Sequence, residues 1–360
     1  MSQAALVLLF LLLPLGTTPM ECATLLVAGA ALASRRRIHQ PLLAPAVMLF
    51  ASSLVAADGI EPSQLWSATI GAWTWALLVF APPAFAGLSA AGRARIEQVG
   101  LAAASAAGLW AVVETVVGGA APWHAPVDGP FSHHLTLGYA LLAPLARSLW
   151  TRRWWSAFLI GLGIGCAGAS GPLLSTGVLV AALVLPPAAA LTGGVGVALM
   201  AVLALAGDAE LAQRVVLWTA GADVALDHPH GAGLAGVRPA TALAQTAVAP
   251  GFHFPFHAHD SALQAAAVGG WAGWVAAAWA LFALWRHTDR PGRAAIAAAV
   301  VGGLTQDTLG DLEVTRALCA WAILGGQPPP SPHAASAILP GANEPLRAHA
   351  VRQPDPEEVP

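Results

Sequence analysis

Three histidines and an aspartate stand directly before a long apolar segment in the last third of the chain. His253, His257, His259 and Asp260 are followed by SALQAAAVGGWAGW. A neutral imidazole, whose pKa is near 6.5, can take a proton from a hydroxyl group close to neutral pH. His259 is a candidate for proton transfer because it stands at a helix entrance without a capping role of its own.

The residues next to His259 also have a purely structural interpretation. Ser261 and Gln264 have the S-x-x-Q spacing of a capping box, and a carboxylate at Asp260 would stabilise the positive end of the helix. This interpretation accounts for Asp260 and Ser261 and leaves His259 unexplained.

The same histidines could instead hold a metal ion through the pattern H-x3-H-x-H. His257 and His259 are one residue apart, so they point to opposite faces of an extended chain, and no carboxylate follows at the spacing of HExxH. We therefore expect neither a bound metal nor another cofactor.

Arginine, tryptophan and glycine mark the segment upstream. Arg214 and Trp218 lie one helical turn apart in RVVLW. An amphipathic interfacial helix with tryptophan at headgroup depth explains this pair, and the local sequence favours it. The alternative is a guanidinium that binds a lipid diphosphate through bidentate hydrogen bonds. The run HPHGAGLAG, residues 228–236, predicts a tight turn.

Other polar groups stand near the ends of apolar segments. His133 and His134 begin one such segment in FSHHLTLG, where a structural role is favoured over catalysis. Glu114 lies within a turn or so of a segment end, so we expect its carboxylate to reach the interface. Mutual ion pairing is the simplest account of the last cluster, which comprises Asp307, Asp311, Glu313 and Arg316.

The composition indicates what kind of protein must position these groups. Of the 360 residues, 57% are hydrophobic and only 10% are charged, whereas soluble domains have about 25% charged residues. Mean hydropathy is +0.66. These values predict an integral membrane protein built from helices. The formal net charge of −3 gives no electrostatic reason to expect a nucleic-acid partner.

Proline, glycine and charged residues divide the chain into apolar segments. A spanning helix needs about 20 mostly apolar residues, and on this basis we predict an all-α bundle of about 12 transmembrane spans. Their approximate positions are 4–18, 20–34, 41–57, 65–87, 98–118, 133–149, 154–171, 174–191, 194–207, 262–285, 293–309 and 312–325.

The arginine distribution tests this count independently, because cytoplasmic loops concentrate basic residues. With the N-terminus in the cytoplasm, the connections on that side contain Arg35, Arg36, Arg37, Arg93, Arg95, Arg147, Arg152, Arg153, Arg286, Arg290 and Arg293. The exceptions on the opposite side are Arg214, Arg238 and Arg316. This alternation supports the count and predicts that both termini are cytoplasmic.

The pattern defines two regions. Residues 1–326 form the predicted transmembrane domain, in which the longest connection, residues 208–260, lies on the periplasmic side. Residues 327–360 are rich in proline and polar residues, which predicts a disordered cytoplasmic tail. The apolar N-terminal segment lacks a basic flank and a clear cleavage site, so we expect a retained first span rather than a signal peptide.

Taken together, these motifs resemble the O-antigen ligase and polymerase superfamily, bacterial integral-membrane glycosyltransferases. The family shows H-N-x-x-L-Q and then G-x-x-G in the next span, which match His259, Asp260, Leu263, Gln264, Gly270 and Gly273. Its R-x3-W and later P, G-x-G turn are similar to Arg214, Trp218, Pro229, Gly231 and Gly233. Its F-x-H-x-x-T-x-G entry to a span resembles Phe131, His133, Thr136 and Gly138.

The resemblance covers roughly residues 120–325 and includes three departures. A family arginine in a Ser-Arg-Gly turn corresponds best to Thr176, between Ser175 and Gly177, so threonine replaces one of two arginines that contact the donor diphosphate. Asp260 replaces the usual asparagine, and the outer loop is short for a ligase.

The resemblance implies metal-independent, inverting glycosyl transfer at the periplasmic face of the inner membrane. The donor would be a polyprenyl-diphosphate-linked glycan and the acceptor a lipid or glycan hydroxyl, with membrane lipids around the protein. His259 would be the general base, Asp260 would hold its tautomer, and Arg214 would stabilise the departing diphosphate. Further substrate contacts would come from Arg238, Arg316, Trp218, His257 and His133.

Three other functions stay open. A family member without activity would act in polysaccharide assembly, which the replacement at Thr176 allows. The histidine loop would suit a metal-binding membrane protein. A transporter would place charged residues at a midplane cavity, whereas the predicted spans are almost free of charge.

Overall fold

The computed structural model of the chain describes residues 2–15, 17–33, 40–54, 72–119, 126–131, 133–204, 209–251, 260–304, 306, 308 and 311–326. Most of these residues are helical and none of them is in a β-strand, which confirms the predicted all-α class. The chain divides into two compact units, Met1–Gln327 and Pro328–Pro360. All described residues belong to the first, so the predicted tail lies outside them.

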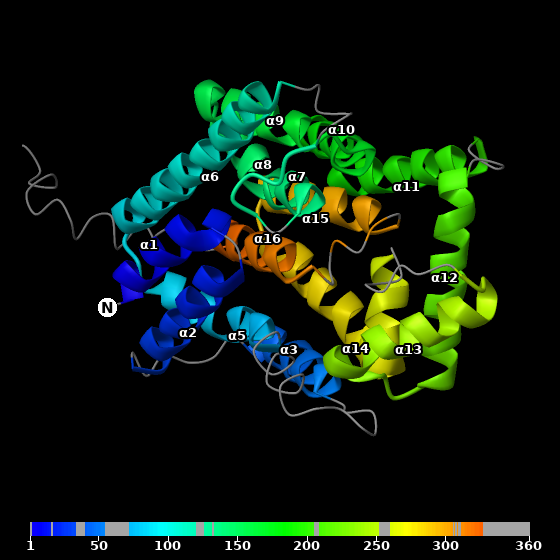
Figure 1. Ribbon diagram of the computed structural model, residues 1–360. Coiled ribbons are helices and arrows are strands. Elements are labelled where there is room, and N and C mark those ends of the chain that lie inside the picture. Colours follow the sequence, from blue (N-terminus) through cyan, green and yellow to red (C-terminus); the bar gives the residue numbers. More distant parts are fainter. Residues whose placement is uncertain are drawn as a thin grey trace, which may run out of the picture. The chain divides into compact units, whose positions relative to one another are not determined.

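The helices follow one another along the chain as Figure 1 shows. Their bounds are α1 Ser2–Leu12, α2 Thr17–Ala33, α3 Gln40–Ser53, α5 Ala76–Ala86, α6 Ala90–Gly118, α7 His134–Ala140, α8 Leu142–Trp150, α9 Trp154–Cys166, α10 Ser170–Val184, α11 Pro187–Ala204, α12 Ala209–Asp227, α13 Gly233–Val248, α14 Ser261–His287, α15 Arg290–Gly303 and α16 Leu312–Gly325. Two 3-10 turns, η1 Leu13–Leu15 and η2 Trp73–Trp75, follow α1 and precede α5.

Helix α16 lies at the centre of this unit. Every side chain from residue 313 to 324 is buried, and α2, α5, α7, α8, α14 and α15 all contact this helix. Figure 1 shows α16 between α1 and α15. Because its surroundings are protein on all sides, any charged residue of α16 needs a partner inside the fold.

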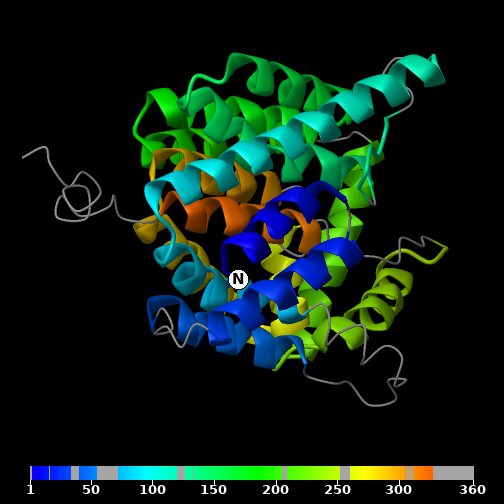
Figure 2. The same cartoon turned by 90° about the vertical axis from the view of Figure 1, so that its left-hand side faces the viewer.

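Glycine allows two pairs of helices to approach closely. Helix α6 crosses α9 where a Cβ at Gly163 would lie 2.6 Å from the Cα of Gly108. Both views show these two helices side by side (Figures 1 and 2). Helix α3 packs on α14 through Ser52, whose Oγ would lie 2.8 Å from a Cβ at Gly269. Small residues at helix crossings are typical of packing inside membranes.

Two described helices are long and apolar enough to cross a membrane by length and composition, Ala90–Gly118 and Ser261–His287. Shorter apolar helices of 10–17 residues are Gln3–Leu12, Pro19–Ala33, Leu42–Ser53, Ala76–Ala86, Trp154–Cys166, Ser170–Val184 and Pro187–Met200. The predicted span 133–149 is divided at Leu141 between α7 and α8, and the predicted outer loop contains α12 and α13. The number of spans stays a prediction.

Large apolar side chains lie on the surface of several helices. Val116 and Val117 of α6, Trp155 of α9, Val184 of α10 and Leu243 of α13 are between 73% and 82% exposed. In water, each Å² of such surface costs about 25 cal/mol relative to an apolar environment. Large exposed apolar patches mark contact with a membrane or with another protein, so this surface favours membrane association.

One arginine joins three helices at their ends. Arg147, in the last turn of α8, pairs with Glu97 of α6 at 2.7 Å and also with Asp289, the N-cap of α15. The neighbouring Arg290 donates to the carbonyl oxygen of Leu185 at the end of α10, at 2.8 Å. Positive charge also stabilises the negative C-terminal ends of helices. These arginines, predicted to be cytoplasmic, therefore have a structural role.

Replacing Arg147 by alanine should leave two carboxylates without their shared cation. Breaking a buried pair costs about 3–5 kcal/mol, and these groups are partly exposed, so we expect a loss of about 2 kcal/mol of stability. Arg95→Ala removes an exposed arginine of α6 and should cost less than about 0.5 kcal/mol. Thermal unfolding of both purified variants, followed by tryptophan fluorescence, measures the difference. Equal midpoints would contradict the role of Arg147.

Candidate functional site

Buried polar side chains gather where the N-terminal ends of α7, α10, α14 and α16 meet the C-terminal end of α15. We name this group the polar end cluster, and its members are Thr136, Tyr139, Ser175, Ser261, Gln306, Thr308 and the half-buried Asp311. Ser261 Oγ lies 3.3 Å from the carbonyl oxygen of Gln306 and 3.3 Å from Thr308 Oγ1. The cluster therefore joins side chains from helices that are far apart in the sequence.

The motif residues at the start of α7 have structural contacts. His133 is exposed and is the N-cap of α7, and its Nδ1 accepts a backbone N–H at 3.2 Å. The hydroxyl of Thr136 donates to the carboxylate of Asp311 at 2.5 Å. A Cβ at Gly138 would lie 2.6 Å from Pro172 of α10. The structural interpretation of His133 is confirmed, while its contact with a substrate stays a prediction.

Asp260 is the N-cap of α14, as its predicted place at the helix entrance requires. Its Oδ1 accepts the N–H groups of Ala262 and Leu263, both at 2.8 Å. The prediction that Ser261 begins a capping box was wrong, because the carboxylate one position earlier takes these contacts and the Ser261 hydroxyl bonds to Gln306 instead. Burial raises the pKa of Asp260, although its two backbone hydrogen bonds oppose the shift.

Arg214 is brought toward the polar end cluster by α12. It is half-buried one turn from the half-buried Trp218, and its guanidinium interacts electrostatically with Tyr139. The predicted helix around this pair is confirmed. Arg238 lies exposed on α13. Arg214 therefore acts electrostatically on a member of the cluster.

Arg316 is neutralised inside the fold. Its side chain has no exposed surface, and its Nη2 lies 3.5 Å from Oε1 of Glu21 in α2. Asp311 and Glu313 also interact with it electrostatically. Ion pairing was predicted for this cluster, but the partner at hydrogen-bond distance comes from 295 positions away. Both residues lie near the N-terminal ends of their helices, so the pair joins the beginnings of α2 and α16.

The predicted tight turn in HPHGAGLAG inserts into a break in α14. Gly270 has φ +61° within this helix, a conformation that interrupts its hydrogen-bonding pattern. The N–H of Trp271 donates to the carbonyl oxygen of Pro229 at 3.2 Å, and the N–H of Ala232 donates to that of Ala267 at 2.8 Å. The P, G-x-G turn and the G-x-x-G span thus contact each other directly.

The predicted general base, His259, lies outside the described residues, as do His253 and His257. Among the residues that the structure does describe, no three His, Cys, Asp or Glu side chains form a group able to hold a metal ion. The histidine loop itself is thus untested as a metal site, and the assignment of His259 stays a prediction.

Two residues at or near the site were missed by reasoning from the sequence. Tyr139 is the only tyrosine of the chain, and Glu21 is a carboxylate inside an apolar segment. A carboxylate in a span is costly unless it is paired, so the position of Glu21 could have predicted a cationic partner. For Tyr139 the sequence offered only that it is the single tyrosine of the chain.

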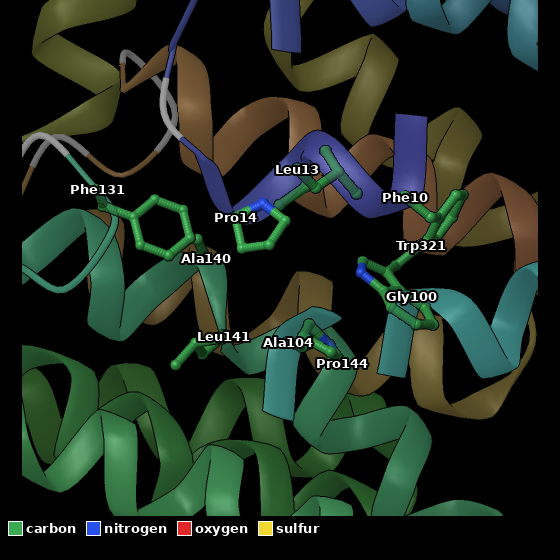
Figure 3. A pocket seen from close by; sticks show the side chains of 11 residues that line it. Phe10, Leu13, Pro14, Gly100, Ala104, Phe131, Ala140, Leu141, Pro144 and Trp321 are labelled. Carbon is green, nitrogen blue, oxygen red and sulfur yellow. The ribbon is translucent and has the colours of Figure 1, made fainter. Parts of the chain in front are cut away.

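An apolar cavity is also present in the described part of the chain (Figure 3). Its lining residues are Phe10, Leu13, Pro14, Gly100, Ala104, Phe131, Ala140, Leu141, Pro144, Ala317 and Trp321. The rings of Phe10 and Trp321 pack edge to face, with centroids 4.9 Å apart. Because none of its lining residues is titratable, this cavity supplies neither a base nor a charge to a reaction.

No protein-family model matches the sequence, and no curated protein matches it. The resemblance to the glycosyltransferase superfamily therefore rests on the motifs and on where they lie.

Gly270→Ala should destabilise the protein, because its Cβ would overlap the carbonyl oxygen of Pro229 in a backbone conformation that L-residues rarely adopt. We expect a cost of at least about 2 kcal/mol. In the control Gly161→Ala, the Cβ meets open space on α9, and a gain of up to about 1 kcal/mol is expected. Thermal unfolding compares the two variants; similar midpoints would mean that the break does not depend on glycine.

Asp311 should make stability depend on pH. Burial raises the pKa of its carboxyl, against hydrogen bonds from Thr136 and two backbone groups. Because the folded pKa is above the unfolded value near 3.9, the folded state binds more protons, and stability is lost as pH rises from about 4 through the raised pKa. Asp311→Asn removes this titration and should lose less stability over that rise. Asp227→Asn, at an exposed position, is the control. The free energy of unfolding is measured against pH for all three proteins, and an identical profile for the wild type and Asp311→Asn would refute the assignment.

Proposed function

We propose that this protein is a multi-pass glycosyltransferase of the bacterial inner membrane. It transfers a glycan from a polyprenyl diphosphate to an acceptor hydroxyl on the periplasmic face, in the manner of O-antigen ligases and polymerases. The acceptor is a lipid or a glycan, and the reaction takes place without a metal ion or another cofactor.

The membrane part of this proposal is supported by the surface and the charges together. Apolar side chains are exposed on helices throughout the unit, and charge is concentrated near helix ends. Arg147 and Arg290 bind groups at or near helix ends. The predicted topology puts these two arginines on the cytoplasmic side and the polar end cluster on the periplasmic side. About 12 spans with both termini in the cytoplasm account for this separation.

The observation that carries the proposal is the convergence of the motif pieces. Thr136, from the F-x-H-x-x-T-x-G segment, bonds to Asp311 in the polar end cluster. Ser261, from the H-D-x-x-L-Q segment, donates its hydroxyl to the carbonyl oxygen of Gln306 in the same cluster. Arg214, from the R-x3-W segment, interacts with Tyr139 there. Two segments that define the resemblance thus supply side chains to one end of the fold, and a third supplies a cation that acts on it electrostatically.

The proposed reaction requires one base and one cation. His259 takes the proton of the acceptor hydroxyl, and the oxygen attacks the anomeric carbon of the donor sugar with inversion. The bond between that carbon and the phosphate oxygen breaks, and the diphosphate leaves with the electron pair. Arg214 stabilises this growing negative charge, which is often the largest contribution to such catalysis. Asp260 is bound to the helix end by its Oδ1, so the carboxylate can hold the adjacent imidazole in one tautomer through its other oxygen.

The remaining substrate contacts are proposed from the place of each residue in the motifs. Trp218 follows Arg214, His257 precedes the general base, and His133 belongs to the F-x-H-x-x-T-x-G segment. These three side chains are proposed to contact the glycan or the acceptor. Arg238 is exposed on α13 and is proposed to contact the donor. Arg316 is the weaker candidate because Glu21 already neutralises it.

His259→Ala and Arg214→Ala should each lower turnover by about two to three decades, the size typical of losing one preorganised group. Two controls, His287→Ala and Arg95→Ala, remove exposed residues at helix segments predicted to be on the cytoplasmic side, and they should keep near-normal turnover. Transfer of a glycan from a lipid-linked donor in vesicles measures all four. Near-normal transfer by either site variant removes that assignment, and loss of activity on adding EDTA would favour a metal held by the histidine loop.

A deletion strain separates the two members of the superfamily that the chain resembles. Loss of a polymerase shortens surface glycan chains, whereas loss of a ligase leaves long chains on the lipid carrier. Glycan length and lipid-linked intermediates are measured together in the same strain. A strain unchanged in both properties would contradict the proposed function.

A further inference from the structure

Two buried hydroxyl groups face each other within the polar end cluster. Tyr139 is 4% exposed and Ser175 has no exposed surface. Neither hydroxyl oxygen has a hydrogen bond of good geometry within the described residues, although the two side chains are close enough to interact. A buried hydroxyl without a partner is unfavourable, because it has lost its hydrogen bonds to water. A pair of such groups therefore marks a place where another polar group belongs.

Glycines place these hydroxyls against the start of α10. A Cβ at Gly302 of α15 would lie 2.7 Å from Ser175 Oγ and would overlap the ring of Tyr139. A Cβ at Gly171, the second residue of α10, would overlap the Tyr139 hydroxyl oxygen itself. The tyrosine hydroxyl is therefore directed at the first turn of α10.

The first turn of α10 attracts negative charge. The helix has 15 residues, and its N-cap, Ala169, provides no side-chain hydrogen bond to the first N–H groups. The N–H groups of Ser170 and Gly171 are the donors of this turn, because Pro172 has none. Such N–H groups, with the helix dipole behind them, bind anions and phosphates. Arg214 of α12 adds a positive charge that acts electrostatically on Tyr139.

We propose that Tyr139, Ser175, the N-terminal turn of α10 and Arg214 together bind the diphosphate of the lipid-linked donor. This inference rests on the proposed function and names residues for one part of it. Thr176, which stands where the family has an arginine, donates its hydroxyl to Pro172 of its own helix at 2.9 Å. In this chain the hydroxyl groups of Tyr139 and Ser175 and the N-terminal end of α10 contact the diphosphate, where the family uses its second arginine.

Hydrogen bonds from Tyr139 and Ser175 to a phosphate oxygen are of the strong kind, since one partner carries charge. Each contributes about 1.5–3 kcal/mol, which is about a tenfold to hundredfold change in the dissociation constant. Because the contact is made to bound donor as well as to the transition state, its loss should raise KM for the donor more than it lowers kcat.

The test uses the purified full chain with inorganic diphosphate and farnesyl diphosphate as probes in isothermal titration calorimetry. Tyr139→Phe keeps the ring and removes the hydroxyl, and Ser175→Ala removes the second donor. Ser105→Ala is the matched control, because its hydroxyl bonds to the Leu101 carbonyl oxygen within α6 at 2.7 Å. Thermal unfolding identifies any variant that fails to fold, and KM for the donor is measured alongside.

Each outcome of these measurements decides one part of the question. Weaker binding of the probes by about tenfold or more in Tyr139→Phe and Ser175→Ala, with Ser105→Ala unchanged, supports the site. Tighter binding of farnesyl diphosphate than of inorganic diphosphate assigns the site to a lipid-linked anion, and equal binding assigns it to the anion alone. If the probes bind and only Arg214→Ala weakens them, the inference about Tyr139 and Ser175 fails while the proposed function stands. If neither probe binds the wild type, the diphosphate donor itself is refuted.

Discussion

The break in α14 and the turn that fills it are the contact on which the arrangement of the site depends. A helix in apolar surroundings cannot leave backbone groups without partners, so a conformation such as that of Gly270 is stable only if another segment completes the hydrogen bonds. The Pro229 carbonyl oxygen and the Ala232 N–H do so. The same contact fixes α12 and α13 to α14, because the turn connects those two helices. The position of Arg214 relative to the start of α14 follows from it.

Charge is handled in two ways in this fold. Where a charge is buried, as at Arg316, a carboxylate from a distant helix neutralises it. Where a helix end needs a partner, a short polar side chain caps it, as Asp260, Asp289 and Asp311 cap α14, α15 and α16. Both devices leave the middle of the helices apolar and collect polar groups at the ends. A site with reactive polar groups is therefore built from helix termini rather than from a polar core.

Local features of this fold were predictable from the sequence, and long-range ones were not. The apolar runs predicted helices, HPHGAGLAG predicted a turn, and Asp260 was expected at a helix entrance, because each depends on neighbouring residues. The division of the predicted span 133–149 at Leu141 did have a local signal that the prediction left unused, because Pro144 has no N–H to donate to the carbonyl oxygen of Ala140, where α7 ends. The break at Gly270 is visible in sequence only as a glycine, since its conformation depends on contact with the 228–236 turn, and no local pattern shows that these two segments meet.

The candidate site follows the same division. The motif residues were named from spacing, but spacing does not tell which of them meet. Glu21 and Arg316 are 295 positions apart, and Thr136 and Asp311 are 175 apart. Tyr139 carried no motif signal, and its environment is made by Gly171 and Gly302 from two other helices. Such contacts arise when distant helices pack together, and no short stretch of the sequence shows which helices will pack.

The ion pairs of Arg147 impose an order on biogenesis. Glu97 precedes Arg147 in the chain, so a nascent protein that has reached α8 can already neutralise this cation with one carboxylate. Asp289 leaves the ribosome about 140 residues later, with the start of α15. Chains fold from the N-terminus as they are made. The first half of the chain can therefore form the Glu97–Arg147 ion pair, and the Arg147–Asp289 pair forms only once the last quarter is being translated. Until Asp289 is made, Glu97 alone neutralises Arg147 and the contact between α8 and α15 is incomplete.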